Sequence, residues 1–114
     1  MKRPAPRDVA RFADMLAAMG NESRLRVVRL LLAAHPVGMV AGDIQGELGI
    51  GASNLSHHLE KLKNEGLVGV QREGVFLRYT ANAVALEALL TFLLSECCAR
   101  TKAVPSGKII RLCT

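Results

Sequence analysis

Residues 52–66 read ASNLSHHLEKLKNEG, and this stretch decides the fold. Its apolar residues Ala52, Leu55, Leu59 and Leu62 are spaced by three, four and three positions, which predicts an amphipathic helix over residues 52–65. A glycine-containing turn, residues 49–51, precedes it, and residues 40–48 predict a shorter helix before that turn. Two short helices joined in this way are typical of a helix-turn-helix.

Segments rich in strand-forming side chains follow this helix. Residues 67–72 and 75–80 flank the pair Glu73-Gly74, which predicts a β-hairpin with its turn at that pair. A hairpin directly after a helix-turn-helix is a wing. Before the helix-turn-helix, residues 8–19 and 22–34 predict two more helices, with Asn21 as the N-cap of the second. We expect five side chains of the first helix to face the core: Val9, Phe12, Ala13, Leu16 and Met19.

The last predicted helix, residues 83–100, has apolar residues around most of its circumference. In so small a protein, that pattern predicts burial against a partner subunit. The 114 residues are expected to form a single domain, 1–114, with an irregular tail over about 103–114 that carries Cys113. The fold class is therefore mainly α with a small β-hairpin wing (α+β), a winged helix-turn-helix that dimerises through its first and last helices.

The charge balance points to a polyanionic partner. Fifteen Lys and Arg oppose ten Asp and Glu, which gives a net charge of +5 and a pI near 9.6. We expect no membrane association, because no apolar run reaches the length of a spanning helix. The N-terminus lacks a secretory signal pattern, so we expect a cytoplasmic protein whose three cysteines are thiols. No nucleophile–base pair, phosphate loop or HExxH motif is present, so we do not expect an enzyme.

Short polar side chains near the start of the 52–65 helix have the chemistry that reads base edges in a major groove. Basic and polar wing residues are placed to contact the backbone or the minor groove. The predicted contacts with double-stranded operator DNA are Ser53, Asn54, Ser56, His57 and Lys61 on the helix, and Gln71, Arg72, Arg78 and Tyr79 on the wing. His58 lies nearer the apolar edge, so a structural, hydrogen-bonded role is expected for it.

Three segments resemble the ArsR/SmtB family of repressors. Residues 18–31, AMGNESRLRVVRLL, resemble its opening helix pattern; residues 53–68 resemble its recognition helix; and residues 72–79 resemble its R-x-G-R-x-x-x-Y wing, with Val75 in place of the usual Arg. The similarity covers about residues 10–100. It implies a homodimer that represses by binding an operator and is released by an inducer, usually a metal or metalloid ion.

The family's two well-known effector sites do not carry over. Val40 and Gly42 stand where one site has its cysteines. Asn82, Val84, Ser95 and Cys98 stand where the zinc site on the last helix needs Asp and His near its start and His and Glu near its end. Neither site is therefore expected in this chain.

The three cysteines all lie in the last eighteen residues: Cys97, Cys98 and Cys113. Three soft thiolates without a His or carboxylate companion suit a thiophilic ion. We expect trivalent arsenic, as arsenite, to be the inducer, with trivalent antimony as antimonite also fitting the same thiolates, and no catalytic cofactor. A methylarsenite bound by two cysteines, cadmium or lead, and a thiol redox or persulfide sensor stay open as alternatives. A constitutive DNA-binding protein with incidental cysteines is a remoter one.

Overall fold

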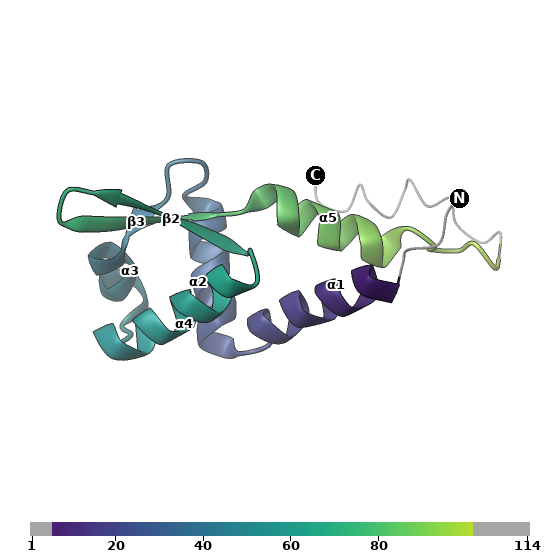
Figure 1. Cartoon of the computed structure of the whole chain (residues 1–114), viewed down its shortest axis with the longest axis horizontal. Helices are drawn as coiled ribbons and strands as arrows, with labels where there is room; N and C mark the ends of the chain where they lie inside the picture. The colour runs from purple at the N-terminus through teal and green to yellow at the C-terminus, as the bar shows by residue number, and fades with distance from the viewer. Residues whose placement is uncertain (1–5, 102–114) are drawn as a thin grey trace. The chain divides into compact units, whose positions relative to one another are not determined.

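The computed structural model describes residues 6–101. The chain forms five helices and three short strands in the order α1 (Pro6–Met19), α2 (Glu22–Ala33), β1 (Met39–Val40), α3 (Ala41–Leu48), α4 (Ala52–Asn64), β2 (Val68–Glu73), β3 (Phe76–Ala81) and α5 (Ala83–Leu94) (Figure 1). It divides into two compact units between Ala83 and Val84. The first holds all of α1 to β3, and the second holds the rest of α5 and the turns that follow it. The predicted single domain over residues 1–114 stays a prediction.

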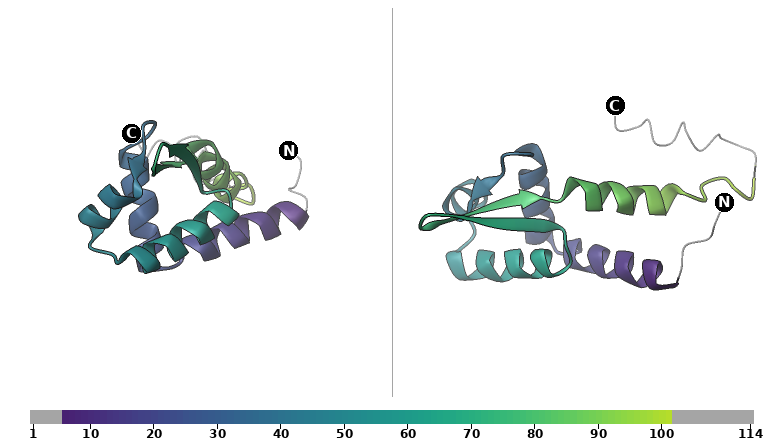
Figure 2. Two further views of the ribbon diagram at one scale, coloured as in Figure 1. Left: turned by 60° about the vertical axis from the view of Figure 1, so that its left-hand side comes forward. Right: turned by 45° about the horizontal axis from the view of Figure 1, so that its top comes forward.

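The first unit has the architecture of a winged helix-turn-helix. Helices α1, α2, α3 and α4 pack on one another, and the hairpin of β2 and β3 packs on α4 and α2 (Figure 2). The strands form one antiparallel sheet in the order β1-β3-β2. Across residues 6–101, every helix falls short of the length and hydrophobicity that a membrane-spanning helix needs.

Apolar side chains from all four helices, from the residue before β2, and from the roots of β2 and β3 form the core of this unit. They are Phe12, Met15, Ala18, Val27, Val28, Leu31, Ile44, Leu55, Leu59, Leu62, Leu67, Val68 and Ala81. The predicted stripe of α4 is confirmed at its three leucines. The predicted N-cap is also confirmed, because the Asn21 side chain accepts a hydrogen bond from the Arg24 N–H at 3.1 Å.

The predicted inward face of α1 is partly wrong. Phe12 is buried, but Val9 is 52% and Leu16 is 43% exposed, and Met15 is buried in their place. Helix α1 carries apolar residues on two adjacent faces, and only one of them packs on α2 and α4. The Val9–Leu16 face stays uncovered within the single chain.

The wing and the last helix differ from their predicted bounds. Glu73 pairs with Phe76, so the hairpin turns at Gly74-Val75, one residue later than expected. Gly74 takes the positive φ of 61°, and a glycine first in a two-residue turn fits type II′. Helix α5 ends at Leu94 instead of residue 100, where the Ser95 hydroxyl donates to the Phe92 carbonyl at 2.9 Å. Such a local side-chain bond competes with helix continuation.

One strand was not predicted. Residues 39 and 40 form β1, which pairs with β3 through Met39↔Tyr79 and Val40↔Arg78. The approach is close: a Cβ at Gly38 would lie 2.2 Å from the Tyr79 carbonyl oxygen, and Gly38 has a φ of 77°. Only glycine therefore fits where the chain enters β1.

We expect Gly38→Ala to lower the free energy of unfolding by at least about 3 kcal/mol, because backbone atoms of β3 must move as well as φ being strained. Gly74→Ala is the matched control, since Gly74 also has a positive φ but has open space around it. That variant should lose only about 1–2 kcal/mol. Chemical denaturation measures both, and equal losses would show that the contact with β3 carries no cost.

Candidate nucleic-acid interface and thiol pair

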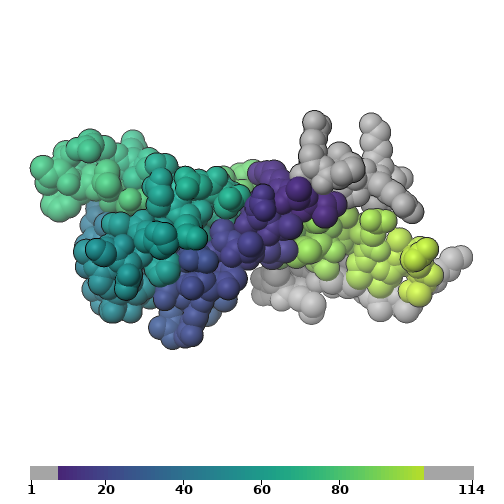
Figure 3. Space-filling model, turned by 60° about the horizontal axis from the view of Figure 1, so that its bottom comes forward, coloured from purple at the N-terminus to yellow at the C-terminus, as the bar shows by residue number. Residues whose placement is uncertain are grey.

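The outer face of α4 carries the predicted DNA-reading residues. Ser53, Asn54, Ser56, His57 and Lys61 are all exposed, whereas Leu55, Leu59 and Leu62 of the same helix are at most 2% exposed. In Figure 3 this helix, in teal, lies open on the same face as the green hairpin. The packing of the leucines therefore turns one continuous polar face outward.

The start of α4 is electrostatically suited to a phosphate. Its first turn contains no acidic residue, and the N-cap Gly51 has no side chain to bond the first N–H groups. The helix dipole places partial positive charge at this end, where unsatisfied N–H groups favour an anion. The exposed Lys61 adds positive charge further along the helix.

The predicted wing contacts divide between the two faces of the hairpin. The pairing Val70↔Tyr79 and Arg72↔Leu77 puts Arg72 and Tyr79 on one face, and Gln71↔Arg78 puts the other two on the opposite face. Gln71 and Arg72 are exposed. The face of Tyr79 also carries buried Val68 and Ala81, and it is the face directed to the core.

Arg78 and Tyr79 are engaged within the protein. Arg78 donates to the Glu73 carboxylate at 2.9 Å and to the Gly38 carbonyl at 3.3 Å. Burial raises the pKa of the Tyr79 phenol, and the Glu60 carboxylate raises it further. Arg78 would have to exchange Glu73 for a phosphate, so its predicted contact costs more than that of Arg72. None of these contacts with DNA is tested by the structure.

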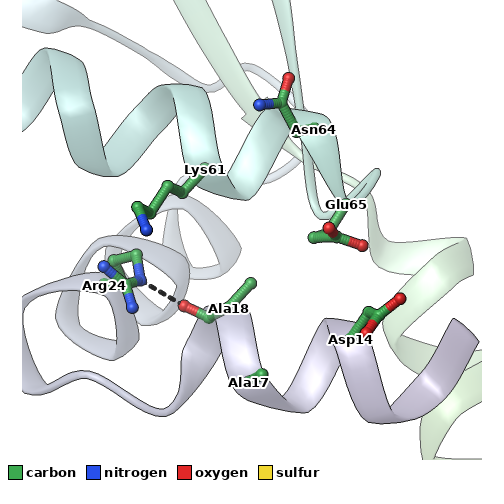
Figure 4. A pocket seen from close by; sticks show the side chains of 7 residues that line it. All are labelled: Asp14, Ala17, Ala18, Arg24, Lys61, Asn64 and Glu65. Atoms are coloured by element: carbon green, nitrogen blue, oxygen red, sulfur yellow. Dashed lines mark hydrogen bonds between the residues drawn. The ribbon is translucent and has the colours of Figure 1, made fainter. Parts of the chain in front are cut away.

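Arg24 of α2 helps to hold α4 in place, and the sequence analysis did not predict this role. Its Nε donates to the Ala18 carbonyl at the end of α1, and its Nη1 lies 3.4 Å from Nδ1 of His58 on α4. Figure 4 shows Arg24 reaching the Ala18 carbonyl beside Lys61. These residues line a pocket of about 250 Å³ together with Asp14, Ala17, Asn64 and Glu65. The sequence offered one signal for this role, because Arg24 lies on the side of α2 that faces the core.

His58 has the structural, hydrogen-bonded role that the sequence predicted. Arginine can only donate, so Nδ1 of His58 accepts and the neutral ring carries its proton on Nε2. Burial lowers the pKa of His58, and the positive charges of Arg24, His57 and Lys61 lower it further. The folded protein therefore favours the neutral ring.

The sign of this shift predicts acid sensitivity. A histidine with a lowered folded-state pKa binds more protons when unfolded, so its stabilising effect is complete above the unfolded value of about 6.5 and is lost as pH falls below it. We expect the parent to lose more stability than His58→Gln between about pH 7 and pH 5, since glutamine keeps an acceptor but does not titrate. Urea denaturation across that range measures the difference, and parallel curves would contradict it.

The two described cysteines lie beyond α5 rather than within it. Successive turns follow Leu94, with Cys97 N–H bonded to the Leu94 carbonyl at 2.9 Å and Thr101 N–H to the Cys98 carbonyl at 3.1 Å. Cys98 has a positive φ of 62°. The Cys97 and Cys98 sulfurs are 3.4 Å apart, and both side chains are partly exposed. Neighbouring side chains in a helix point about 100° apart. Because Cys97 and Cys98 lie outside the helix, this rotation does not separate their sulfurs.

The thiol pair is incomplete as a metal site within the described residues. In residues 6–101, no three His, Cys, Asp or Glu side chains gather as they would around a metal ion. Cys113, the predicted third ligand, lies outside the described residues. The hydrogen bond with Cys98 raises the pKa of the Cys97 thiol, and desolvation and the charge of Cys98 act in the same direction.

Fold and interface together define a winged helix-turn-helix DNA-binding protein. Residues 19–71 match a family model described as a helix-turn-helix domain. The transcriptional activator HlyU of Vibrio cholerae is 31% identical over 84 residues, which cover 74% of this chain and 75% of HlyU. The HTH-type transcriptional regulator YgaV of Escherichia coli is 31% identical over 75% of this chain and 85% of its own. The transcriptional repressor SdpR of Bacillus subtilis is 28% identical over 72% and 88%.

Solved structures agree with these relatives. HlyU from Vibrio cholerae superposes with a TM-score of 0.67 at 29% identity and covers 82% of this chain and 99% of its own. The homodimeric winged helix-turn-helix DNA-binding domain Mb0332 of Mycobacterium bovis shares the fold, with a TM-score of 0.62 at 24% identity over 92% of this chain and 100% of its own. The chain belongs to the ArsR/HlyU family of winged helix-turn-helix transcription regulators.

Proposed function

We propose that this regulator is a homodimeric repressor that binds operator DNA through α4 and the wing, and that trivalent arsenic bound by Cys97 and Cys98 releases it. The observation that carries the effector half is the pair of adjacent thiols 3.4 Å apart, directly after the last helix. The DNA-binding half rests on the exposed polar face of α4 and the family to which the chain belongs.

Uncovered apolar side chains support the dimer. On α1, Val9 and Leu16 lie seven residues apart, on one face, and both are more than 40% exposed. On α5, Val84 is 79% exposed, and Leu90 and Leu93 are each 52% exposed. Side chains of this size gain about 1.5–3 kcal/mol each when fully buried, so a second copy is the favoured cover for both helices. The related Mb0332 domain is itself described as homodimeric.

A dimer presents two α4 helices to successive major grooves of a roughly palindromic operator. The relatives include a transcriptional activator, HlyU, as well as a transcriptional repressor, SdpR. For this chain we propose repression. The protein is expected to act in the cytoplasm, where its thiols stay reduced.

We expect Asn54→Ala to weaken operator binding by about 10- to 100-fold, because an asparagine that reads a base is worth about 1–3 kcal/mol. Lys63→Ala is the matched control, since Lys63 lies on the same helix but at its far end, 3.9 Å from the Glu60 carboxylate. Fluorescence anisotropy with a duplex selected from random sequence by the parent measures both.

Sedimentation should give the mass of a dimer for the parent and for both of these variants. A monomeric parent would contradict the dimer. An Asn54→Ala variant that binds as well as Lys63→Ala would remove Asn54 from the interface.

The geometry of the thiol pair is compatible with a pyramidal arsenic centre. Metal–thiolate bonds are about 2.3 Å long in zinc sites, and two such bonds to sulfurs 3.4 Å apart enclose an angle of about 95°. A tetrahedral centre needs about 109°, as zinc sites do. A pyramidal ion with a lone pair suits the narrower angle. Cys113 would then supply the third sulfur, and a methylarsenite would need only the pair.

The chemistry of capture is a condensation. Neutral arsenous acid, As(OH)₃, reacts with two thiols to form two As–S bonds and two waters, and a third thiol removes the last hydroxyl as water. The raised pKa of Cys97 keeps it a thiol near neutral pH, which slows attack by oxidants but does not oppose condensation. Bridging both sulfurs would rearrange the turns after α5 and so change how α5 meets its partner.

We expect stoichiometric arsenite to release the parent from the selected duplex, and Cys97→Ser and Cys98→Ser to prevent release while leaving operator affinity unchanged. Ala99→Ser, an exposed residue directly after the pair, is the control and should respond like the parent. If arsenite releases Cys113→Ser from the duplex as readily as the parent, Cys97 and Cys98 are sufficient for the response. Anisotropy measures release, and an unresponsive parent would exclude arsenite as the inducer.

The pH dependence of binding separates arsenite from divalent metals. Condensation with arsenous acid releases no net proton, so its affinity should change little between about pH 6 and pH 8. Cadmium must displace the thiol protons, so its affinity should rise up to about tenfold per pH unit for each proton released. Calorimetric titration of the protein without DNA measures both ions, and a steep pH dependence for arsenite would contradict the condensation.

A further inference from the structure

The tip of the wing is apolar and projects into solvent. Val75 is 88%, Phe76 is 60% and Leu77 is 39% exposed. Figure 1 shows the hairpin of β2 and β3 extending past the helices of the first unit, and Figure 2 shows the same from a second side. These three residues, which we call the wing tip, are not among the buried core side chains of the unit that carries them.

The two strands present the wing tip on both of their faces. Phe76 pairs with Glu73, and Leu77 pairs with Arg72, so consecutive tip residues point to opposite sides of the hairpin. Val75 directly precedes Phe76, in the two-residue turn that joins the strands. A flat protein surface covers only one face of a ribbon, whereas a groove encloses both. The wing tip has the form of a wedge.

The charges beside the wing tip match a polyanion. Arg72 is exposed on β2 and shares a face with Leu77. The one carboxylate of the outer hairpin, Glu73, is paired with Arg78 at 2.9 Å. The hairpin that carries the wing tip also packs beside the DNA-reading helix, because β2 contacts α4. A duplex bound to α4 is therefore the surface that the wing tip meets.

We propose that Val75 and Phe76 enter the minor groove beside the major groove read by α4, and bend the duplex by wedging between base steps. Apolar side chains that enter minor grooves unstack base steps in this way and kink the DNA. Arg72 then holds the adjacent phosphate. The inference rests on the operator binding proposed above. It adds a preference for a flexible TA or CA/TG step at the point where the wing tip enters the duplex. This preference needs no hydrogen bond to a base edge, because it comes from how easily the step deforms.

The test uses the full-length protein and the duplex that the parent selects from random sequence, labelled at both ends for energy transfer. The parent should bend it by at least about 20°. The double variant Val75→Ser with Phe76→Ser should leave it straight and bind about tenfold more weakly. Its salt dependence should be unchanged, because no charge is removed. Replacing the flexible step by a stiff A-tract should weaken the parent but not the double variant.

Two controls keep the outcome specific. Val37→Ser removes a valine that is 67% exposed outside the wing, and it should bend DNA like the parent. Arg72→Ala should keep the bend but lower the salt slope by about one. Circular dichroism and sedimentation check that the double variant keeps its fold and dimer.

A straight duplex with the parent, or an equal bend with the double variant, overturns the wedge while operator binding stands. If selection enriches no sequence, operator binding itself fails, which is a different result.

Discussion

The rest of the DNA-reading surface depends on the burial of one stripe, Leu55, Leu59 and Leu62. These leucines are at most 2% exposed, and α4 packs through them on α1, α2 and α3. Because side chains on a helix keep fixed angular positions, burying this stripe also fixes where the opposite face points. The polar residues of α4 need no contact of their own with the core to be held in one orientation. The packing of the three leucines therefore determines which way the polar face of α4 points.

Electrostatics refine the orientation that packing sets. Arg24 joins the end of α1 to His58 of α4, where burial first and the nearby positive groups second lower the pKa of His58 and favour its neutral ring. On the wing, Glu73 holds Arg78 while Arg72 stays exposed. Two arginines of similar sequence context thus differ in their availability to a phosphate. The difference comes from the pairing register of the hairpin, which sequence alone does not display.

Periodic patterns predicted the elements well, and their limits explain the errors. The leucines of α4 and the N-cap Asn21 were predicted because each follows from local spacing or local hydrogen bonding. The strand β1 was missed because two residues have no period, and its pairing partner lies about 40 residues away. The apolar stretch after residue 83 gave no end signal, so α5 was predicted six residues too long. The DNA contacts, the third ligand Cys113 and the inducer stay predictions.

The short strand β1 has a mechanical consequence for the wing. It pairs with β3 only at residues 78 and 79, so the middle of β3 lies in a three-stranded sheet, whereas Phe76 and Leu77 at the tip have β2 as their one neighbouring strand. An isolated two-stranded ribbon is only marginally stable in water. Rigidity therefore declines along the hairpin from root to tip. The outer half of the hairpin therefore has more freedom to bend than the part that β1 holds beside the helices.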